Sequence, residues 1–221
     1  MALTKFNYNS FDVTSAASTA LGFNANANGF ATINPGSMTL IKTLTASSSA
    51  NLSFVDGSSS VVLDNTYPVY MFKFINIHPS ASDEKLGFNL SVDGGSNYNV
   101  SKTTTYFIAY HDEADSATAL SYDPYGIDLA NGTGVNYFSV GVGNGNDECL
   151  SGEMTLFNPS STTFVKHFTG RANNYYQADY TMDNYFAGYA NTTSAVNAIQ
   201  FSMSSGNIDA GTIKLYGIKD S

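Results

Sequence analysis

The end of the chain carries the pattern that most restricts its fold. In VNAIQFSMSSGNIDAGTIKLYGIKDS, Ile199, Phe201 and Met203 alternate with polar residues, and Ile213 and Leu215 do so again after a break rich in turn-forming residues. A period of two places successive side chains on opposite faces of a strand. Both stretches are therefore predicted to be strands with one face in a core, and we interpret them as a strand pair joined by the break.

Similar short alternating or aromatic runs recur along the chain, whereas no segment keeps apolar residues at helical spacing. The predicted strands are 37–44, 51–55, 59–64, 68–77, 85–92, 104–110, 135–142, 150–157, 162–169, 184–190, 198–203 and 211–218. These are too many for one flat sheet, so two packed sheets are the economical arrangement. We predict an all-β, two-sheet antiparallel β-sandwich, jelly-roll-like, over residues 37–221.

Composition and turn residues favour the same fold class. Charged residues make up 12% of the chain, about half the usual ~25%, and Asn, Ser, Thr and Gly replace them. This exchange suits strands and turns better than helices. Asp93, Gly94 and Gly95 separate two predicted strands, Asn158 and Pro159 separate two others, and we expect an antiparallel hairpin at each place.

The predicted strand 68–77 is apolar on both faces. Alternation assigns Val69, Met71, Ile75 and Ile77 to one face and Tyr70, Phe72 and Phe74 to the other. Such a strand is either central and covered twice or packed against another subunit. Lys73 interrupts the first face, so burial of that face would require a partner for its charge.

Two regions lack a strand pattern. Residues 15–37 are small, polar and rich in Gly, with isolated aromatics at Phe23 and Phe30. We predict that residues 1–36 form an extended N-terminal arm that uses these two rings to bind a partner surface. Residues 111–134, rich in Asp and Tyr, are predicted to be a long surface loop of the kind that is often functional.

Charge and targeting signals limit the partners. A net charge of −9 argues against binding nucleic acid, which needs a basic surface. The first residues lack the apolar run of a signal peptide, and no stretch approaches the ~20 apolar residues of a membrane span. We therefore expect a protein made in a cytoplasm, with no membrane partner. Cys149, the single cysteine, excludes an intrachain disulfide and is expected to be a small buried residue.

One acidic cluster is a candidate metal site. Asp112, Glu113 and Asp115 follow His111, and carboxylates crowded in this way could ligate Ca²⁺. The cluster lacks the length and the glycine of an EF-hand loop, so a solvated loop is the favoured interpretation.

The remaining candidates for chemistry are sparse. Glu148 and Glu153 could be nominated as the carboxylate pair of a glycoside hydrolase, and the absence of tryptophan counts against a sugar cleft, although fifteen tyrosines could stack on sugars. The segment 141–147, GVGNGND, lacks the lysine and the helix of a phosphate loop and is predicted to be a turn. His78 and His167 have no zinc-site spacing and are expected to be structural. We predict no enzyme and no cofactor.

Two segments carry recognisable motifs. A final strand of the form G-x-I-x-L-Y-G-[IL] is formed by Gly211, Ile213, Leu215, Tyr216, Gly217 and Ile218. A hairpin of the form S-G-x-x-x-L-x-N-P-S is formed by Ser151, Gly152, Leu156, Asn158, Pro159 and Ser160. In both motifs the chain resembles virion structural proteins of tailed bacteriophages, particularly those of marine phages. The resemblance extends from about residue 60 to the end, and the N-terminal arm lies outside it.

The resemblance implies a β-sandwich or jelly-roll domain in a virus particle, made in the host cytoplasm, and transfers no catalytic residue. It leaves two positions open. The first is a capsid decoration or cement protein on the outer face of the major capsid protein lattice, expected to be a homo-oligomer and by default a trimer. The second is a tail-fibre or receptor-binding module that recognises host surface glycans through exposed tyrosines and the loop 111–134. A glycan-degrading enzyme is the weakest hypothesis for the function.

Overall fold

The computed structural model describes residues 20–23, 30–33 and 37–219. The chain divides into two compact units, one ending at Thr39 and a much larger one from Leu40 to Asp220. In the first unit, β1 (Ala20–Phe23) and β2 (Phe30–Ile33) pair antiparallel with Phe23 opposite Phe30. This hairpin lies in the segment predicted to be an extended arm, and the rest of that arm lies outside the described residues.

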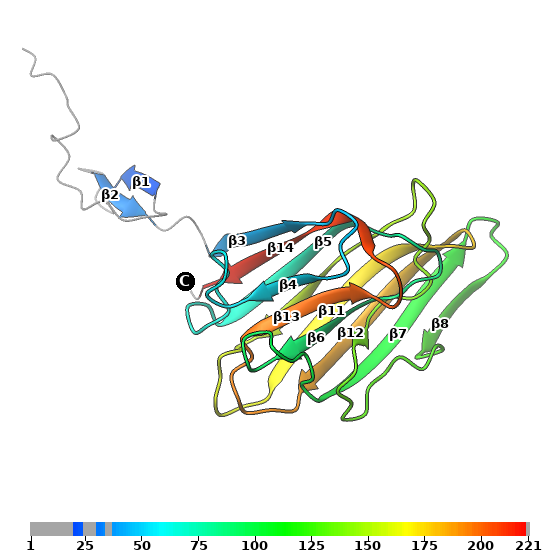
Figure 1. Ribbon diagram of the computed structural model, residues 1–221. Coiled ribbons are helices and arrows are strands. Elements are labelled where there is room, and N and C mark those ends of the chain that lie inside the picture. The colour runs from blue at the N-terminus through cyan, green and yellow to red at the C-terminus, as the bar shows by residue number, and fades with distance from the viewer. Residues whose placement is uncertain (1–19, 24–29, 34–36, 220–221) are drawn as a thin grey trace, which may run out of the picture. The chain divides into compact units, whose positions relative to one another are not determined.

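All further elements are strands (Figure 1). They are β3 (Met38–Thr45), β4 (Leu52–Val55), β5 (Val69–Pro79), β6 (Leu86–Ser91), β7 (Lys102–Asp112), β8 (Thr118–Tyr122), β9 (Asn136–Tyr137), β10 (Leu150–Phe157), β11 (Lys166–Tyr176), β12 (Tyr180–Ala190), β13 (Ala198–Met203) and β14 (Ile208–Ile218). Within the described part of the chain, no helix is long and apolar enough to cross a membrane.

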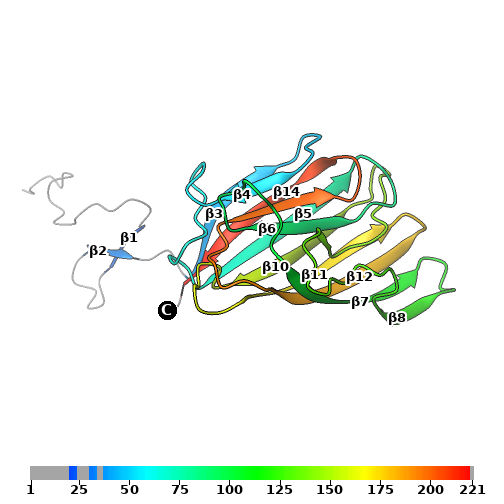
Figure 2. The ribbon, with the colours of Figure 1, turned by 60° about the horizontal axis from the view of Figure 1, so that its bottom comes forward.

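These strands form two antiparallel sheets that pack face to face, which confirms the predicted all-β sandwich. The long sheet has the order β3-β14-β5-β10-β11-β12-β7-β8, and the short sheet has the order β4-β13-β6-β9. Figures 1 and 2 show the short sheet lying over part of the long sheet, while β8 lies at the far edge beyond it.

Nested pairing makes the fold jelly-roll-like. β3 neighbours β14, β4 pairs with β13, β5 with β10 and β6 with β9, as in one long hairpin that has been rolled up. This is the arrangement of a jelly roll. The remaining strands, β7, β8, β11 and β12, come from two inserted hairpins and widen the long sheet beyond β10.

The closing strands have the predicted core faces but not the predicted pairing. Ile199, Phe201, Met203, Ile213 and Leu215 are all buried. However, β13 lies between β4 and β6 in the short sheet, and β14 lies between β3 and β5 in the long sheet. The intervening turn therefore crosses from one sheet to the other. Alternation determines which face is buried, but it does not determine which strand is the neighbour.

One of the two predicted hairpins is present. Asn158 and Pro159 lie between the paired strands β10 and β11. The turn at Asp93 is not a hairpin, because β6 and β7 belong to different sheets. Its carboxylate accepts hydrogen bonds from the Asn97 backbone N–H at 2.9 Å and from the Asn97 side chain at 2.7 Å. Hydrogen bonds from Ser91 and Asn97 lower the pKa of Asp93 to about 2.

Three other predictions of local structure need correction. Residues 59–64 are not a strand, and of the predicted strand 135–142 only β9 is regular. The predicted loop 111–134 begins inside β7 and contains β8. Residues 138–142 are nevertheless buried: Phe138 stacks on Phe186 of β12, and Val142 forms isolated β-bridges with Glu84 and Tyr176. Their apolar character therefore reflects packing in the core, although they form no regular strand.

A β-bulge changes the faces of β5. Tyr70, Phe72 and Phe74 are buried as predicted, but Ile77, assigned to the opposite face, is buried as well. Asn76 has a φ of 51°, and the register shifts there against both neighbouring strands, so the alternation inverts. On the outer face, Lys73 forms an ion pair with Glu153, and this face is open rather than covered by another part of the large unit.

Phe201 joins the two sheets. Its ring contacts Phe72 and Phe74 of β5, each with centroids 5.3 Å apart, and Phe54 of β4 at 6.3 Å. All three contacts are edge-to-face, a geometry that adds to the free energy gained from burial. This cluster fixes the short sheet against the centre of the long one.

We expect Phe201→Ala to lower the free energy of unfolding by about 3–5 kcal/mol, because it leaves a cavity between the sheets. Leu215→Ala, on the facing sheet, should cost about 2–5 kcal/mol. Lys214→Ala, beside Leu215 but on the outer face, is the control and should cost less than about 1 kcal/mol. Urea denaturation measures all three, and a loss below about 1 kcal/mol for Phe201→Ala would contradict the assigned face.

Lys102 is a fully buried cation at the start of β7. Its ammonium donates to Asn89 Oδ1 at 2.6 Å and to the Val100 carbonyl at 2.8 Å. These partners are neutral, so burial lowers the pKa of Lys102 to about 8. Lys166, at the start of β11, is buried in the same way against the Phe164 and Thr192 carbonyls.

The lowered pKa of Lys102 predicts a pH dependence of stability. Below about pH 8 the folded chain holds the buried charge at a cost, and between pH 8 and 10.5 the unfolded chain binds more protons than the folded one. The free energy of unfolding of the wild type, measured relative to Lys102→Met, should therefore rise by roughly 2 kcal/mol from pH 7 to pH 10. A difference that does not change with pH would show that Lys102 titrates normally.

Candidate functional site

The acidic residues Asp112, Glu113 and Asp115 interact with different partners and do not converge on one point. The Asp112 carboxylate accepts hydrogen bonds from the backbone N–H groups of Ser116 and Ala117, each at 2.8 Å, and from the Ser116 hydroxyl. These bonds lower the pKa of Asp112. Asp112 thus stabilises the turn between β7 and β8.

The other two members point to different partners. Asp115 Oδ1 lies 3.1 Å from His111 Nε2, and the Glu113 backbone N–H donates to the Asp179 carbonyl at 3.0 Å. Across residues 20–23, 30–33 and 37–219, no group of three or more His, Cys, Asp or Glu side chains is arranged to hold a metal ion.

Glu148 and Glu153 do not share a cavity. Glu148 Oε2 accepts from the Gly145 N–H at 2.5 Å and lines a hollow with His78 and Asp209. Glu153 lies in a separate hollow on the outer face, beside Lys73 and Arg171. These two carboxylates therefore do not form the facing pair that a glycoside hydrolase uses.

The thiol and the other histidines have structural surroundings. Cys149 is half-buried rather than buried, and burial raises the pKa of its thiol, which is opposite to what a nucleophile requires. His78 Nε2 lies 3.1 Å from the Gly145 carbonyl, and His167 lies beside the Tyr189 ring.

The arm residues Phe23 and Phe30 are register partners at one end of the β1–β2 pair. They come from two strands rather than from one extended segment. Their role in partner binding stays a prediction.

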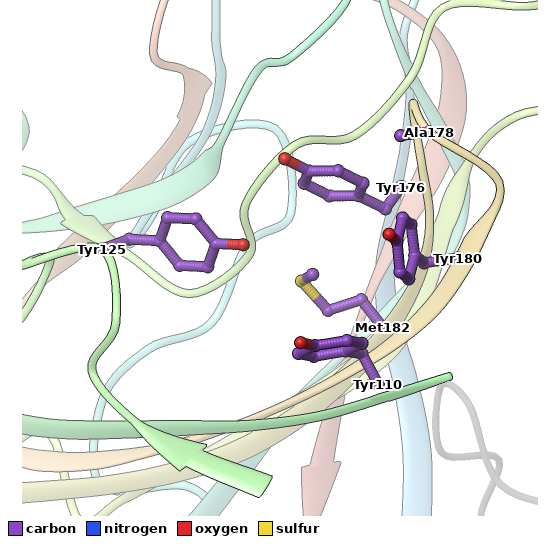
Figure 3. A pocket seen from close by; sticks show the side chains of 6 residues that line it. All are labelled: Tyr110, Tyr125, Tyr176, Ala178, Tyr180 and Met182. Atoms are coloured by element: carbon purple, nitrogen blue, oxygen red, sulfur yellow. The ribbon is translucent and has the colours of Figure 1, made fainter. Parts of the chain in front are cut away.

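One candidate site is a pocket of about 310 Å³ lined mostly by tyrosines (Figure 3). Its lining residues are Tyr110, Tyr125, Tyr176, Ala178, Tyr180 and Met182. Tyr110 of β7 is the register partner of Met182 of β12, and Tyr176 of β11 is the partner of Tyr180. Tyr125 reaches the cavity from the segment that follows β8. We call this cavity the tyrosine pocket.

The rings of the tyrosine pocket meet at nearly right angles. Tyr180 is inclined by 79° to Tyr110 and by 86° to Tyr176, with centroids 5.5 and 5.7 Å apart. In Figure 3, Tyr125 lies opposite Met182, and Tyr176 and Tyr110 lie on the two remaining sides. The pocket is thus bordered by aromatic rings in several orientations.

A buried polar chain positions the wall strands. The Tyr106 hydroxyl donates to Asn184 Oδ1 at 2.6 Å, the Asn184 amide donates to Asn174 Oδ1 at 2.8 Å, and the Asn174 amide donates to the Val140 carbonyl at 3.2 Å. These bonds connect β7, β12 and β11 to the segment 138–142. Satisfied buried networks of this kind specify a single arrangement of the strands.

Gly141 supports one wall. It has a φ of 61°, and a Cβ built on it would lie 1.9 Å from Tyr176 Cε2. Its carbonyl accepts a hydrogen bond from the Gln177 N–H at 3.0 Å. The Tyr176 ring therefore rests directly on backbone that only glycine provides at low cost. Gly141, which supports the Tyr176 ring, is the first residue of segment 141–147, which was predicted to be a turn.

The side chains that line the tyrosine pocket are uncharged, and their polar groups are tyrosine hydroxyls. Burial, together with the charge and hydrogen bond of Tyr176 and the charge of Asp83, raises the pKa of Tyr125 to about 12. Its hydroxyl therefore stays protonated at neutral pH. The residues that line the pocket include no lysine, no arginine and no side-chain amide or carboxylate.

Sequence reasoning missed this pocket. Tyr125 lies in the predicted functional loop, but Tyr175, Tyr176 and Tyr180 lie in a segment for which no strand was predicted. The only signal was their density in NNYYQADY. Tyr110 reaches the site through strand pairing across β7 and β12, which local pattern does not reveal.

The outer face of the long sheet carries a contrasting row of side chains. Register pairing aligns one residue from each of seven strands: Lys214, Lys73, Glu153, Arg171, Tyr185, Phe107 and Tyr122. Arg171 forms an ion pair with Asp183 at 2.6 Å and lies 5.0 Å from the centre of the Tyr185 ring. Phe107 stacks on Tyr185 at 4.7 Å, so both faces of Tyr185 are occupied. This row is held together internally and offers few free ring faces.

No protein-family model matches the sequence, and a search of curated proteins found no match.

We expect Gly141→Ala to lower the free energy of unfolding by about 1–3 kcal/mol and to displace the Tyr176 ring, because the new methyl group overlaps that ring and the positive φ is strained. Urea denaturation and the NMR resonances of Tyr176 measure the two effects. Gly134→Ala is the matched control: a Cβ at Gly134 would meet nothing within 4 Å. Equal stability of the two variants would show that Gly141 does not support the pocket.

Proposed function

We propose that this protein is a structural component of a bacteriophage particle and serves as a capsid decoration protein on the outer face of the major capsid protein lattice. The observation that carries the proposal is the nested pairing of β3 to β14, a jelly-roll arrangement that is common in capsid proteins. In this proposal the protein acts by binding, without catalysis or a cofactor.

The glycines of the phage-like motifs have structural roles in this fold. Gly211 adopts a φ of 108° where β14 bulges against β5, and a Cβ there would lie 2.4 Å from the Asn76 carbonyl oxygen. A Cβ at Gly217 would lie 2.4 Å from Tyr67 Cδ2, and a Cβ at Gly152 would lie 2.4 Å from the Arg171 carbonyl oxygen. The resemblance therefore concerns residues that this sandwich needs, which supports a shared fold with those proteins.

The division of the chain suits a decoration protein. The unit that ends at Thr39 contains its own strand pair, and in this proposal it is the anchor. An ordinary contact buries about 800 Å² per partner, and many copies on a lattice add avidity. The proposal includes a homo-oligomer, by default a trimer, because the capsomer lattice offers threefold positions.

The second candidate is a tail-fibre or receptor-binding module that recognises host surface glycans. The observation that favours it is the exposure of apolar side chains in the predicted loop: Leu120 is 74% and Tyr122 66% exposed at the edge strand β8. An exposed ring at a sheet edge can stack on a sugar. Against it, the neighbouring rings of Phe107 and Tyr185 already cover each other.

We expect the copy number per purified particle to be of the same order as that of the major capsid protein. Decoration of every capsomer requires that stoichiometry, whereas a tail component is present in a few copies. Quantified protein bands or a particle reconstruction gives the number. A count of a few copies would refute decoration and favour the second candidate.

Deleting residues 1–36 tests the anchor in the same particles. The truncated protein should keep the cooperative unfolding of the sandwich but fail to bind capsids from which the protein has been removed. Retained binding would place the contact on the sandwich, and loss of cooperative unfolding would show that the N-terminal segment contributes to the core.

A further inference from the structure

We propose that the tyrosine pocket binds a quaternary ammonium group, such as the trimethylammonium head of a choline-type molecule. This inference goes beyond the proposed function, because it concerns the ligand chemistry of one cavity and holds wherever the protein lies in a particle.

The arrangement of the rings is the first argument. The face of an aromatic ring carries partial negative charge and attracts a cation that lies over it. Tyr180 stands nearly perpendicular to both Tyr110 and Tyr176, and Tyr125 lies on the opposite side with its hydroxyl directed into the pocket (Figure 3). A compact, roughly spherical cation can contact several of these walls at once, whereas a flat ring system could contact only one face.

The charges around the pocket are the second argument. No lysine or arginine lines it, and the charge of Asp83 acts on Tyr125. The chain as a whole carries a net charge of −9. The Met182 thioether, on an almost fully buried side chain, adds a polarisable surface of the kind that packs well against methyl groups. The field inside therefore favours a positive ligand.

The kind of polar group in the lining is the third argument. A sugar presents hydroxyls all round and is bound by amides, carboxylates or charged side chains placed to receive them. The polar side-chain groups that line this cavity are four tyrosine hydroxyls, with no amide, carboxylate or charged group among them. A trimethylammonium group has no N–H that needs an acceptor, so it does not require the amides or carboxylates that this lining lacks.

The size agrees with a small group. A volume of about 310 Å³ is at the lower end of small-molecule sites. It accommodates a head group with a short tail that leads to solvent, rather than a whole oligosaccharide.

The test is a binding measurement with the full-length protein. Choline and tetramethylammonium are titrated by calorimetry and by NMR, beside the neutral isostere of choline in which a tert-butyl group replaces trimethylammonium. We expect both cations to shift the resonances of the pocket tyrosines, and the isostere to bind roughly tenfold or more weakly because it lacks the charge.

Variants separate ring attraction from hydrogen bonding. Tyr180→Phe keeps the ring and should retain choline affinity within about twofold, whereas Tyr180→Leu should weaken it roughly tenfold. Tyr122→Leu, on the outer face, is the control and should change nothing. If Tyr180→Leu fails to fold, the wild-type ligand titration and Tyr180→Phe still decide the question.

Three outcomes would overturn the proposal: equal binding of choline and its neutral isostere, binding of glucose, galactose or N-acetylglucosamine in the pocket with no binding of choline, or no shift of the pocket tyrosines with any cation. None of these bears on the copy number in a particle, so the pocket and the decoration role fail separately.

Discussion

The contact of Phe201 with the rings of the opposite sheet is the interaction on which the rest of the structure depends. A jelly roll is closed only if its last two strands enter different sheets, and β13 and β14 do so here. Phe201 of β13 contacts the rings of Phe72 and Phe74 across the core. Leu215 of β14 is the register partner of the same Phe72 within the long sheet. The end of the chain is thus fixed to one central strand from two directions, beside it in the sheet and above it across the core.

Widening of the long sheet creates the site. The short sheet covers the jelly-roll strands, but the inserted hairpins extend the inner face beyond it. The segment 138–142 covers part of this extension through the stacking of Phe138 on Phe186 and the hydrogen bond between Asn174 and Val140. Where that cover ends, the inner face is lined by tyrosines. Their hydroxyls tolerate contact with water and their rings still bury apolar surface, so the pocket is a direct consequence of an inner face that is longer than its cover.

The sequence pattern predicted which face of each closing strand is buried, but it did not predict which strands pair. The reason is physical. Alternation records which side of a strand is buried, and it correctly assigned Ile199, Phe201, Met203, Ile213 and Leu215. It carries no information on partners, so β13 and β14 were paired wrongly and Asp93 was placed in a hairpin. It also fails where a residue is inserted, as at Asn76, after which Ile77 turns into the core. The candidate site depends on register between strands far apart in the chain, and only Tyr125 lay in a segment that was predicted to be functional.

The two faces of the long sheet use the same residue types in opposite ways, and this difference bears on where recognition occurs. On the outer face, Arg171, Tyr185 and Phe107 stack on one another, so a cation already occupies the ring face that a ligand would use. On the inner face, Tyr110, Tyr176 and Tyr180 meet edge to face, which leaves ring surface directed into a cavity with no cation of its own. On the outer face, the Arg171 guanidinium is the cation that contacts the Tyr185 ring. No lysine or arginine lines the tyrosine pocket on the inner face. A bound cation would therefore contact the inner rings as Arg171 contacts Tyr185. The same attraction that stabilises one face would then provide recognition on the other.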